Sequence, residues 1–176
     1  MNDALENMLG AFALVATDRM QDAIHDAFDQ GGQTPAALAC IGAGPGMTTS
    51  ELMAVLNLSQ PGTTRLVERL VEAGLVEKRA GADARQAHLH LTARGRRQRR
   101  RLLDARATAL EALTATLSKE ERRTMEGLLE RMLTAYPSSE MDKYQACRLC
   151  DQAACVRCPI PAEGVEHPGG ADLSSS

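Results

Sequence analysis

Hydrophobic and polar positions in the first 30 residues recur with the period of an amphipathic helix. The apolar side chains follow at steps of three and four residues, which places them on one helical face: Leu5, Met8, Leu9, Phe12, Val15, Met20, Ile24 and Phe28. Gly31 and Gly32 end this helix, because glycine readily leaves helical geometry. Thr34 and Pro35 then predict the cap of a second helix over residues 36–41, which a glycine-rich segment closes.

A helix-turn-helix pattern follows in the middle of the chain. The periodicity predicts a helix over residues 51–56, a short turn and a second helix over residues 59–73. Ser59 is a suitable N-cap, because its hydroxyl can accept a hydrogen bond from the first free backbone N–H groups. Pro61 fits the first helical turn, where its missing donor costs nothing, and Gly74 supplies a left-handed stop.

Two short strands come next. Residues 75–79 and 87–91 have strand character, and the glycine-containing segment 80–85 joins them as a turn. A helical hairpin followed by a β-ribbon is the layout of a winged helix-turn-helix, whose second helix enters a DNA groove. We therefore predict a mainly α-helical fold with a small β wing.

The helices beyond the wing carry their own start signals. Thr92 can cap a helix whose first turns hold six arginines: Arg94, Arg96, Arg97, Arg99, Arg100 and Arg101. The ordinary interpretation of such a run is a solvated cationic face. Positive charges at a helix start also oppose the macrodipole, and this unfavourable placement suggests a use, so we expect a minority of these side chains to reach phosphates or an acidic partner. Ser118 and Glu121 form a capping-box pattern that opens a last core helix.

The outer helices need a partner. The apolar faces of residues 5–28 and 102–136 are wider than a small winged helix can cover. Burial against a second copy is the economical solution, so we predict a homodimer. Twofold symmetry also suits double-stranded DNA, because two recognition helices one duplex turn apart read a pseudo-palindromic operator.

Charge is distributed unevenly along the 176 residues. The net charge is −3, yet residues 34–106 hold 12 Lys and Arg against 6 Asp and Glu. A basic middle within an acidic chain indicates a duplex-binding module. Trp is absent, so the core must consist of aliphatic side chains and Met. Asp3 and Glu6 replace the cationic start of a signal peptide, and no apolar run reaches membrane length, so we expect a cytoplasmic protein.

Five short motifs carry a family resemblance. They are LSQP at residues 58–61, RLVERL at 65–70, AGLV at 73–76, DAR at 83–85 and LTARG at 91–95. In this order they resemble the multiple antibiotic resistance regulator (MarR) family, and the resemblance covers residues 4–136 in layout. It implies a dimer held by the terminal helices. It also implies a crevice for a small-molecule effector between those helices and the winged domain.

The predicted second helix and the wing supply the candidate DNA contacts. Gln and Thr side chains offer hydrogen bonds to base edges, and Arg can bind guanine or clamp a phosphate. Arg85, at the wing tip, fits a narrow minor groove, and Asp83 would orient it through a salt bridge, a role that the resemblance also implies. The candidate set is Ser59, Gln60, Pro61, Thr63, Thr64, Arg65, Arg69 and Arg85.

The tail after Pro137 is too poor in apolar residues to form a core of its own, yet it holds four of the five cysteines. They form two CxxC units, Cys147 with Cys150 and Cys155 with Cys158. Two such turns can present four thiolates to one tetrahedral ion, so we predict a zinc knuckle over residues 147–158. An iron–sulfur cluster, reversible disulfides and unliganded thiols are the alternatives.

Three other side chains have simpler interpretations. Cys40, within the predicted second helix, is expected to be a small buried hydrophobe rather than a sensor thiol. His88 and His90 share one face of a strand, where a solvent-facing polar pair is the more ordinary interpretation than half of a metal site.

Together these patterns divide the chain into a dimerisation helix (1–33), a winged domain (34–95), C-terminal dimerisation helices (96–136) and the cysteine tail (137–176). They predict a homodimeric DNA-binding regulator, a repressor released by a ligand, metal or redox signal. The alternatives are a thiol–disulfide or metal-handling protein using the CxxC pairs and a structural adaptor. We expect no enzyme, because no strand-then-helix context surrounds either CxxC and no catalytic constellation is visible.

Overall fold

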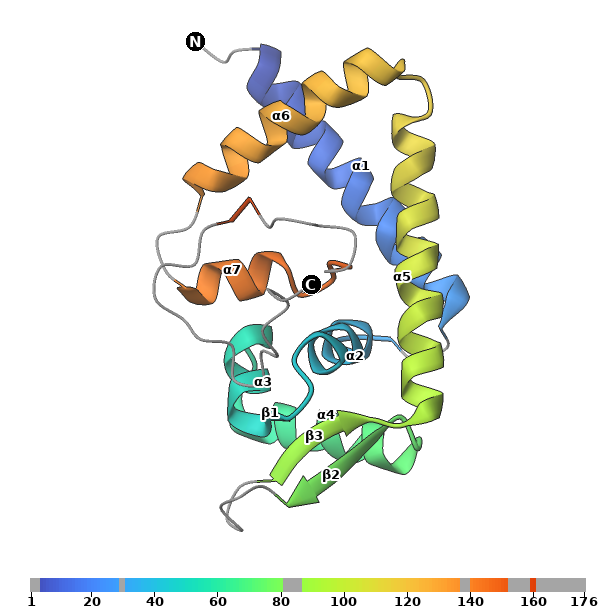
Figure 1. Ribbon diagram of the computed structural model, residues 1–176, viewed down its shortest axis with the longest axis vertical. Coiled ribbons are helices and arrows are strands. Elements are labelled where there is room, and N and C mark those ends of the chain that lie inside the picture. The colour runs from blue at the N-terminus through green and yellow to red at the C-terminus, as the bar shows by residue number, and fades with distance from the viewer. Residues whose placement is uncertain (1–3, 29–30, 81–86, 137–139, 152–158, 161–176) are drawn as a thin grey trace, which may run out of the picture.

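The computed structural model describes residues 4–28, 31–80, 87–136, 140–151 and 159–160. The predicted wing tip with Asp83 and Arg85, and the second CxxC unit with Cys155 and Cys158, lie outside these residues. A compact unit built around a small sheet occupies one end of the molecule, and long helices rise from it (Figure 1). The fold is mainly α-helical with a small β wing, as predicted from the sequence.

The compact unit is a winged helix. Its elements are α2 (Thr34–Ala43), β1 (Met47–Thr48), α3 (Thr49–Leu56), α4 (Gln60–Glu72), β2 (Val76–Ala80) and β3 (Ala87–Leu91). The described sheet has three antiparallel strands in the order β1-β3-β2, with Lys78 opposite Leu89. The sequence predicted two strands. It missed β1 because two residues are too short to show a strand pattern, and the pairing of Met47 with Leu89 depends on the tertiary fold.

Apolar side chains from every element of this unit fill its core. The largest of the fully buried side chains are Leu38, Ile41, Leu52, Leu66, Leu70, Leu75, Leu89 and Leu102. They are aliphatic, as the composition required. Burial of this kind removes water from apolar surface, the main favourable contribution to folding.

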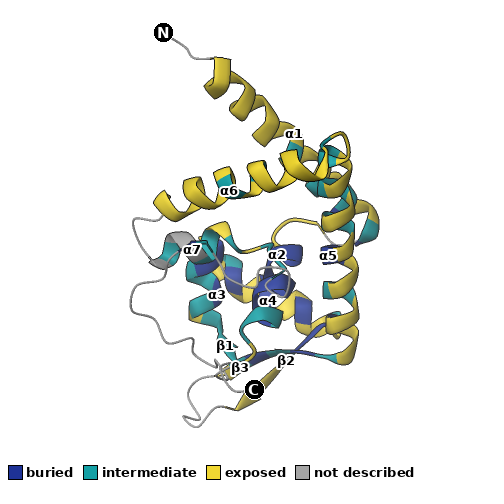
Figure 2. Ribbon diagram, turned by 45° about the horizontal axis from the view of Figure 1, so that its top comes forward, coloured by how far each residue is buried: buried dark blue, intermediate teal, exposed yellow. Residues whose placement is uncertain are grey.

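Long helices extend from the winged unit. They are α1 (Ala4–Ala27), α5 (Ala93–Thr114) and α6 (Lys119–Ala135), followed by the short α7 (Glu140–Ala146). Helix α1 packs along α5, and Ile24 near its end and Phe28 just after it belong to the core. None of the described residues of α6 is buried (Figure 2).

Several helix boundaries follow the sequence signals. Ser59, Thr92 and Ser118 cap α4, α5 and α6, and Ser118 forms the predicted capping box with Glu121. Gly74 has φ +65, the left-handed value expected of a helix stop.

Two boundaries differ from the prediction. Thr34 does not cap α2: it is the first helical residue, buried with its neighbours, and the N-cap Gln33 makes no side-chain cap. Helix α2 is therefore held by core packing rather than by a cap. Helix α3 begins two residues early because Thr48 and Glu51 form an unpredicted capping box, in which the Thr48 N–H donates to Glu51 Oε2 over 2.6 Å.

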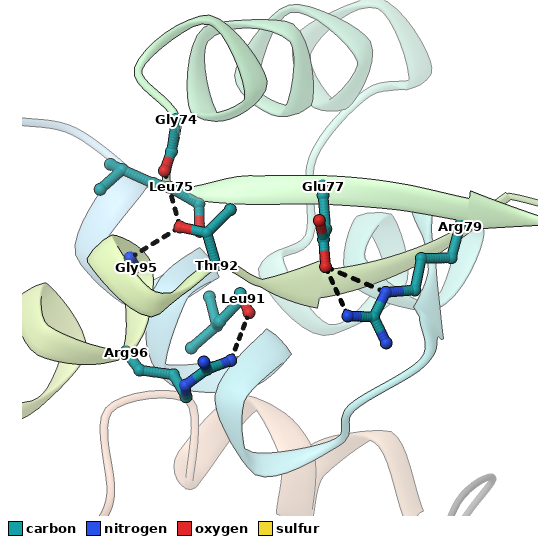
Figure 3. A network of polar contacts seen from close by, with 8 residues as sticks. All are labelled: Gly74, Leu75, Glu77, Arg79, Leu91, Thr92, Gly95 and Arg96. Carbon is teal, nitrogen blue, oxygen red and sulfur yellow. Dashed lines mark hydrogen bonds and ion pairs between the residues drawn. The ribbon is translucent and has the colours of Figure 1, made fainter.

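Close contact joins the end of α4 to the start of α5. The Thr92 hydroxyl donates to the Gly74 carbonyl over 2.6 Å and accepts from the Gly95 N–H over 3.0 Å (Figure 3). A Cβ at Gly95 would lie 2.0 Å from the Leu75 carbonyl oxygen. Glycine is therefore required here for α5 to approach the winged unit, and the orientation of α5 depends on this contact.

Candidate nucleic-acid interface

Helix α4 has two different faces. Leu66, Val67 and Leu70 are buried in the core and hold the helix against α3 and the sheet. The opposite side is exposed and polar, and it contains most of the predicted DNA contacts: Ser59, Gln60, Pro61, Thr64, Arg65 and Arg69. The fold therefore fixes these side chains on one rigid surface, which a helix entering a major groove requires.

Thr63 is an exception, and the structure corrects its predicted role. Its side chain is fully buried, and its hydroxyl donates to the Ser59 carbonyl over 3.0 Å. A threonine in this position cannot reach a base edge. The prediction treated all residues of the first helical turns as outward-facing, although a helix turns by about 100° per residue and therefore directs some of them inward.

The two arginines of α4 are available for anionic partners. Arg65 and Arg69 are exposed, and neither forms an ion pair with another described residue. One other exposed side chain on the helix already forms a hydrogen bond within the protein: the Thr64 hydroxyl donates to the Gln60 carbonyl over 3.0 Å. Arg65 and Arg69 therefore supply the cations of this surface, which also exposes the carboxylates of Glu68 and Glu72.

The wing adds a second basic area. Lys78 and Arg79 are exposed on β2. Arg79 is paired with Glu77, whose Oε1 accepts from Arg79 Nη2 over 2.6 Å and from Nε over 2.9 Å (Figure 3). The predicted wing contact, Arg85, lies outside the described residues, and Lys78, beside the predicted turn, is an exposed cation that the sequence prediction omits.

The arginine-rich start of α5 has a mixed role. Arg96 Nη1 donates to the Leu91 carbonyl over 2.8 Å, and Arg99 Nε donates to the Ala39 carbonyl over 3.3 Å (Figure 3 shows the first). These two side chains bind the protein's own backbone and connect α5 to the sheet and to α2. The other four arginines of the run are exposed: Arg94, Arg97, Arg100 and Arg101.

A pocket lies beside this region. Its volume is about 480 Å³, and α2, the loop after it, the wing strands, α5 and Asp151 of the tail line it. The lining includes four arginines, Arg79, Arg96, Arg99 and Arg100, against the carboxylates of Asp104 and Asp151. Positive charge predominates, so the pocket is suited to an anion.

The two wing histidines contact the loop before β1. The His88 ring Nδ1 lies 2.5 Å from the Gly46 carbonyl oxygen. Desolvation, with a smaller contribution from Arg79, lowers the pKa of His90. Among the described residues no group of three metal-ligating side chains includes this pair.

The cysteines fall into two environments. Cys40 is buried, and its burial raises the pKa of the thiol to about 11, so this thiol stays protonated. Cys147 and Cys150 are half-buried after α7, and the Cys150 N–H donates to the Cys147 carbonyl over 2.9 Å. A hydrogen bond from Cys147 lowers the pKa of Cys150 to about 6, and Arg106 contributes in the same direction.

In the part of the chain that the structure describes, no helix is long and apolar enough to cross a membrane.

Comparison with solved structures shows a shared fold. The apo structure of Escherichia coli MarR superposes with a TM-score of 0.62 at 23% identity, covering 76% of this chain and 99% of that one. The Mycobacterium tuberculosis MarR family protein Rv2887 in complex with DNA gives a TM-score of 0.61 at 20% identity, covering 74% and 98%. The same protein in complex with salicylic acid gives 0.59 at 21% identity, covering 74% and 97%.

Sequence comparison identifies the family. Residues 32–86 match the MarR family model. The HTH-type transcriptional regulator PetP of Rhodobacter capsulatus is 30% identical over 134 residues, which are 76% of this chain and 80% of PetP. The transcriptional repressor MprA of Escherichia coli is 31% identical over 94 residues, about half of each chain at 53%. The chain therefore belongs to the MarR family of transcriptional regulators.

Proposed function

We propose that the protein binds a specific double-stranded DNA operator as a homodimer and represses transcription there. The observation that carries the proposal is the division of α4 into a buried apolar face and an exposed face with Gln60, Thr64, Arg65 and Arg69. Amide and hydroxyl groups suit base edges, and guanidinium groups that pair with no other described residue suit guanine or phosphate. Lys78, on β2, adds positive charge beside this surface.

The homodimer is supported by apolar side chains that one chain leaves uncovered. They lie on α1, on α6 (Figure 2) and at the residue that ends α6, and they include Leu5, Met8, Leu9, Leu14, Leu128, Leu129, Met132 and Tyr136. Monomeric proteins rarely expose large apolar patches. A second copy would cover it and would place two α4 helices on a pseudo-palindromic site.

Repression is the direction that the relatives favour. MprA is named a transcriptional repressor, and Rv2887 was crystallised with DNA. A dimer seated on an operator blocks access to the same DNA, which requires no further chemistry from the chain. We therefore assign repression rather than activation.

Binding of a promoter fragment at fixed salt tests the assignment to α4. Arg65→Ala should weaken operator binding by about 1–3 kcal/mol, as loss of a good base or phosphate contact does. Arg123→Ala is the matched control, because it removes the same exposed side chain from α6. If Arg65→Ala and the wild type bind the operator with equal affinity, Arg65 does not contact DNA and the assignment of the interface to α4 is wrong.

Arg85→Ala tests the wing in the same assay, with an expected loss of the same size per half-site, about 1–3 kcal/mol. An unchanged affinity would mean that this arginine does not touch DNA.

The pocket supports a small anionic effector. Its arginines can pair with a carboxylate, and Rv2887 was crystallised with salicylic acid. Salicylate should weaken operator binding by the wild type, and Arg100→Ala should reduce that response. A variant that responds as the wild type does would show that the pocket is not the effector site.

A further inference from the structure

The cysteine turn after α7 is not explained by DNA binding. Helix α7 lies between α6 and α3 (Figure 1), and Met141 and Tyr144 pack against the core of the winged unit. Leu149, between the two cysteines, packs there as well. The Cys40 thiol donates to the Arg148 carbonyl over 3.6 Å. One end of the tail is therefore anchored on the winged unit.

The tail returns to a different part of the molecule. The Thr134 hydroxyl of α6 shares its one hydrogen between the Glu130 carbonyl at 2.8 Å and the Pro159 carbonyl at 3.0 Å. Ile160, the next residue, is only 4% exposed. The tail therefore contacts the winged unit at Leu149 and the outer helix α6 at Pro159. In the proposed dimer these are the DNA-binding part and the dimerisation part, whose relative orientation sets the spacing of the two α4 helices.

The two thiols before this crossing are arranged for a shared ligand. The Cys150 N–H donates to the Cys147 carbonyl over 2.9 Å, and the side chains are hydrogen-bonded to each other. Both remain half-exposed, whereas Cys40 is buried. A tight CxxC turn of this kind directs two sulfur atoms toward one point that an ion can reach.

A cation on α5 faces this turn. Arg106 is near enough to Cys150 for their charges to interact. Its Nε is buried and finds no hydrogen-bond acceptor among the residues that the structure describes. A buried donor without an acceptor is unfavourable, and a metal-bound thiolate is a suitable acceptor for it.

We propose that Cys147 and Cys150 bind a thiophilic divalent cation, zinc, and that the bound ion fastens the tail between the winged unit and α6. Each thiol gives its proton to solvent as a metal–sulfur bond forms, so no electron is transferred. No third His, Cys, Asp or Glu side chain completes the site among the described residues. Cys155 and Cys158 are the ligands that their spacing predicts, and they lie outside those residues.

Zinc titration of the reduced, chelator-treated full-length protein tests the site. We expect one zinc per chain, and Co²⁺ in its place should give sulfur-to-metal charge-transfer absorption. Cys147→Ser with Cys150→Ser should abolish both signals, and Cys40→Ala should retain them. Stoichiometric metal in the double variant would overturn the proposal. So would a reduced wild type that binds no zinc but forms a Cys147 to Cys150 disulfide with a hydroperoxide.

Two further experiments test which cysteines bind the ion and whether the ion holds the tail between the winged unit and α6. Cys155→Ser with Cys158→Ser should weaken zinc binding and change the Co²⁺ spectrum if four thiolates bind, whereas an unchanged spectrum would contradict the zinc knuckle. Zinc should slow amide hydrogen exchange in α7 and around Ile160 in the wild type but not in the Cys147, Cys150 double variant. Equal exchange rates with and without zinc would overturn the fastening.

Coupling to the operator rests on the proposed function. We expect zinc to change operator affinity about tenfold, a typical coupling between two sites, and to leave the Cys147, Cys150 double variant unaffected. Zinc binding without any change in affinity would overturn the coupling. If neither protein binds the operator in either condition, the proposed function fails while the metal result stands by itself.

Discussion

Helices α4 and α6 are similar in length and in amphipathic pattern, but they are used in opposite ways. Helix α4 buries Leu66, Val67 and Leu70 within its own chain and exposes its polar face. Helix α6 leaves its apolar side chains in solvent, with Leu128 52% and Met132 50% exposed. The winged unit is therefore complete within one chain, whereas the outer helices leave an apolar face that the proposed second copy would cover.

This difference distinguishes the stability of a single folded chain from the stability that association with a second copy would add. Removing an apolar side chain from the winged unit lowers stability at any protein concentration. If the proposed dimer forms through α6, changing the apolar face of this helix acts through association, so its effect depends on protein concentration. Matched pairs of mutations, one in the winged unit and one in α6, can therefore test whether only the α6 mutation has an effect that depends on protein concentration.

Leu129→Glu should have the largest effect. A second copy covering α6 would bury the new carboxylate without a partner, which costs at least roughly 5 kcal/mol. Sedimentation should show a monomer or an unfolded chain, while Arg123→Glu, on the same helix but off the apolar face, should remain dimeric. A dimeric, DNA-competent Leu129→Glu protein would mean that α6 is not the interface.

Leu70→Ala should destabilise the winged unit itself. Its side chain is fully buried, so the substitution leaves a cavity and costs about 2–5 kcal/mol. Chemical denaturation at two protein concentrations should show the same loss for Leu70→Ala. For Leu128→Ala the loss should grow with dilution, and a loss independent of concentration would contradict the proposed interface.

Gly95→Ala and Gly127→Ala should differ in sign. An added Cβ at Gly95 meets the Leu75 carbonyl at 2.0 Å, so we expect a cost of about 1–3 kcal/mol. Nothing lies within 4 Å of the same atom at Gly127, where alanine should stabilise the helix by about 0.5–1 kcal/mol. Thermal unfolding measures both, and destabilisation by Gly127→Ala would indicate that a partner helix approaches closely there.

The capping box of α6 should give the smallest effect. Ser118→Ala should cost about 1 kcal/mol at neutral pH, measured by thermal unfolding beside Thr48→Ala as the corresponding change in α3. Hydrogen bonds from Ser118 lower the pKa of Glu121, so this stabilisation is present above the ordinary glutamate pKa and is lost as pH falls through the lowered value. The difference in thermal stability between the wild type and Ser118→Ala should therefore become smaller at acidic pH. A constant difference would exclude Glu121 from the cap.

Much of the fold could be read from local signals. Ser59, Gly74, Thr92 and Ser118 lie where the sequence placed them, because caps and left-handed stops depend on chemistry within a few residues. Cys40 was predicted to be buried and is buried, since a lone cysteine on an apolar helix behaves as a small hydrophobe.

Signals that depend on distant residues were missed. Helix α7 has no core of its own and was not predicted, yet Met141 and Tyr144 use the core of the winged unit. Thr63 was assigned to DNA from its position near the helix start, and only packing against the rest of the domain showed that it faces inward. The roles of Arg96 and Arg99 also required the carbonyl groups of Leu91 and Ala39 to be placed beside them.

The sequence by itself determined the order of the helices from α1 to α6, several of their ends, the wing and the family, because these follow from local propensity and short motifs. Only the tertiary structure decided which face of α4 is free, which arginines of α5 bind the protein's own backbone and where Cys147 and Cys150 lie relative to Arg106. Those outcomes depend on contacts between residues far apart in the chain, and the free energy of such contacts exists only once the core has brought the elements together.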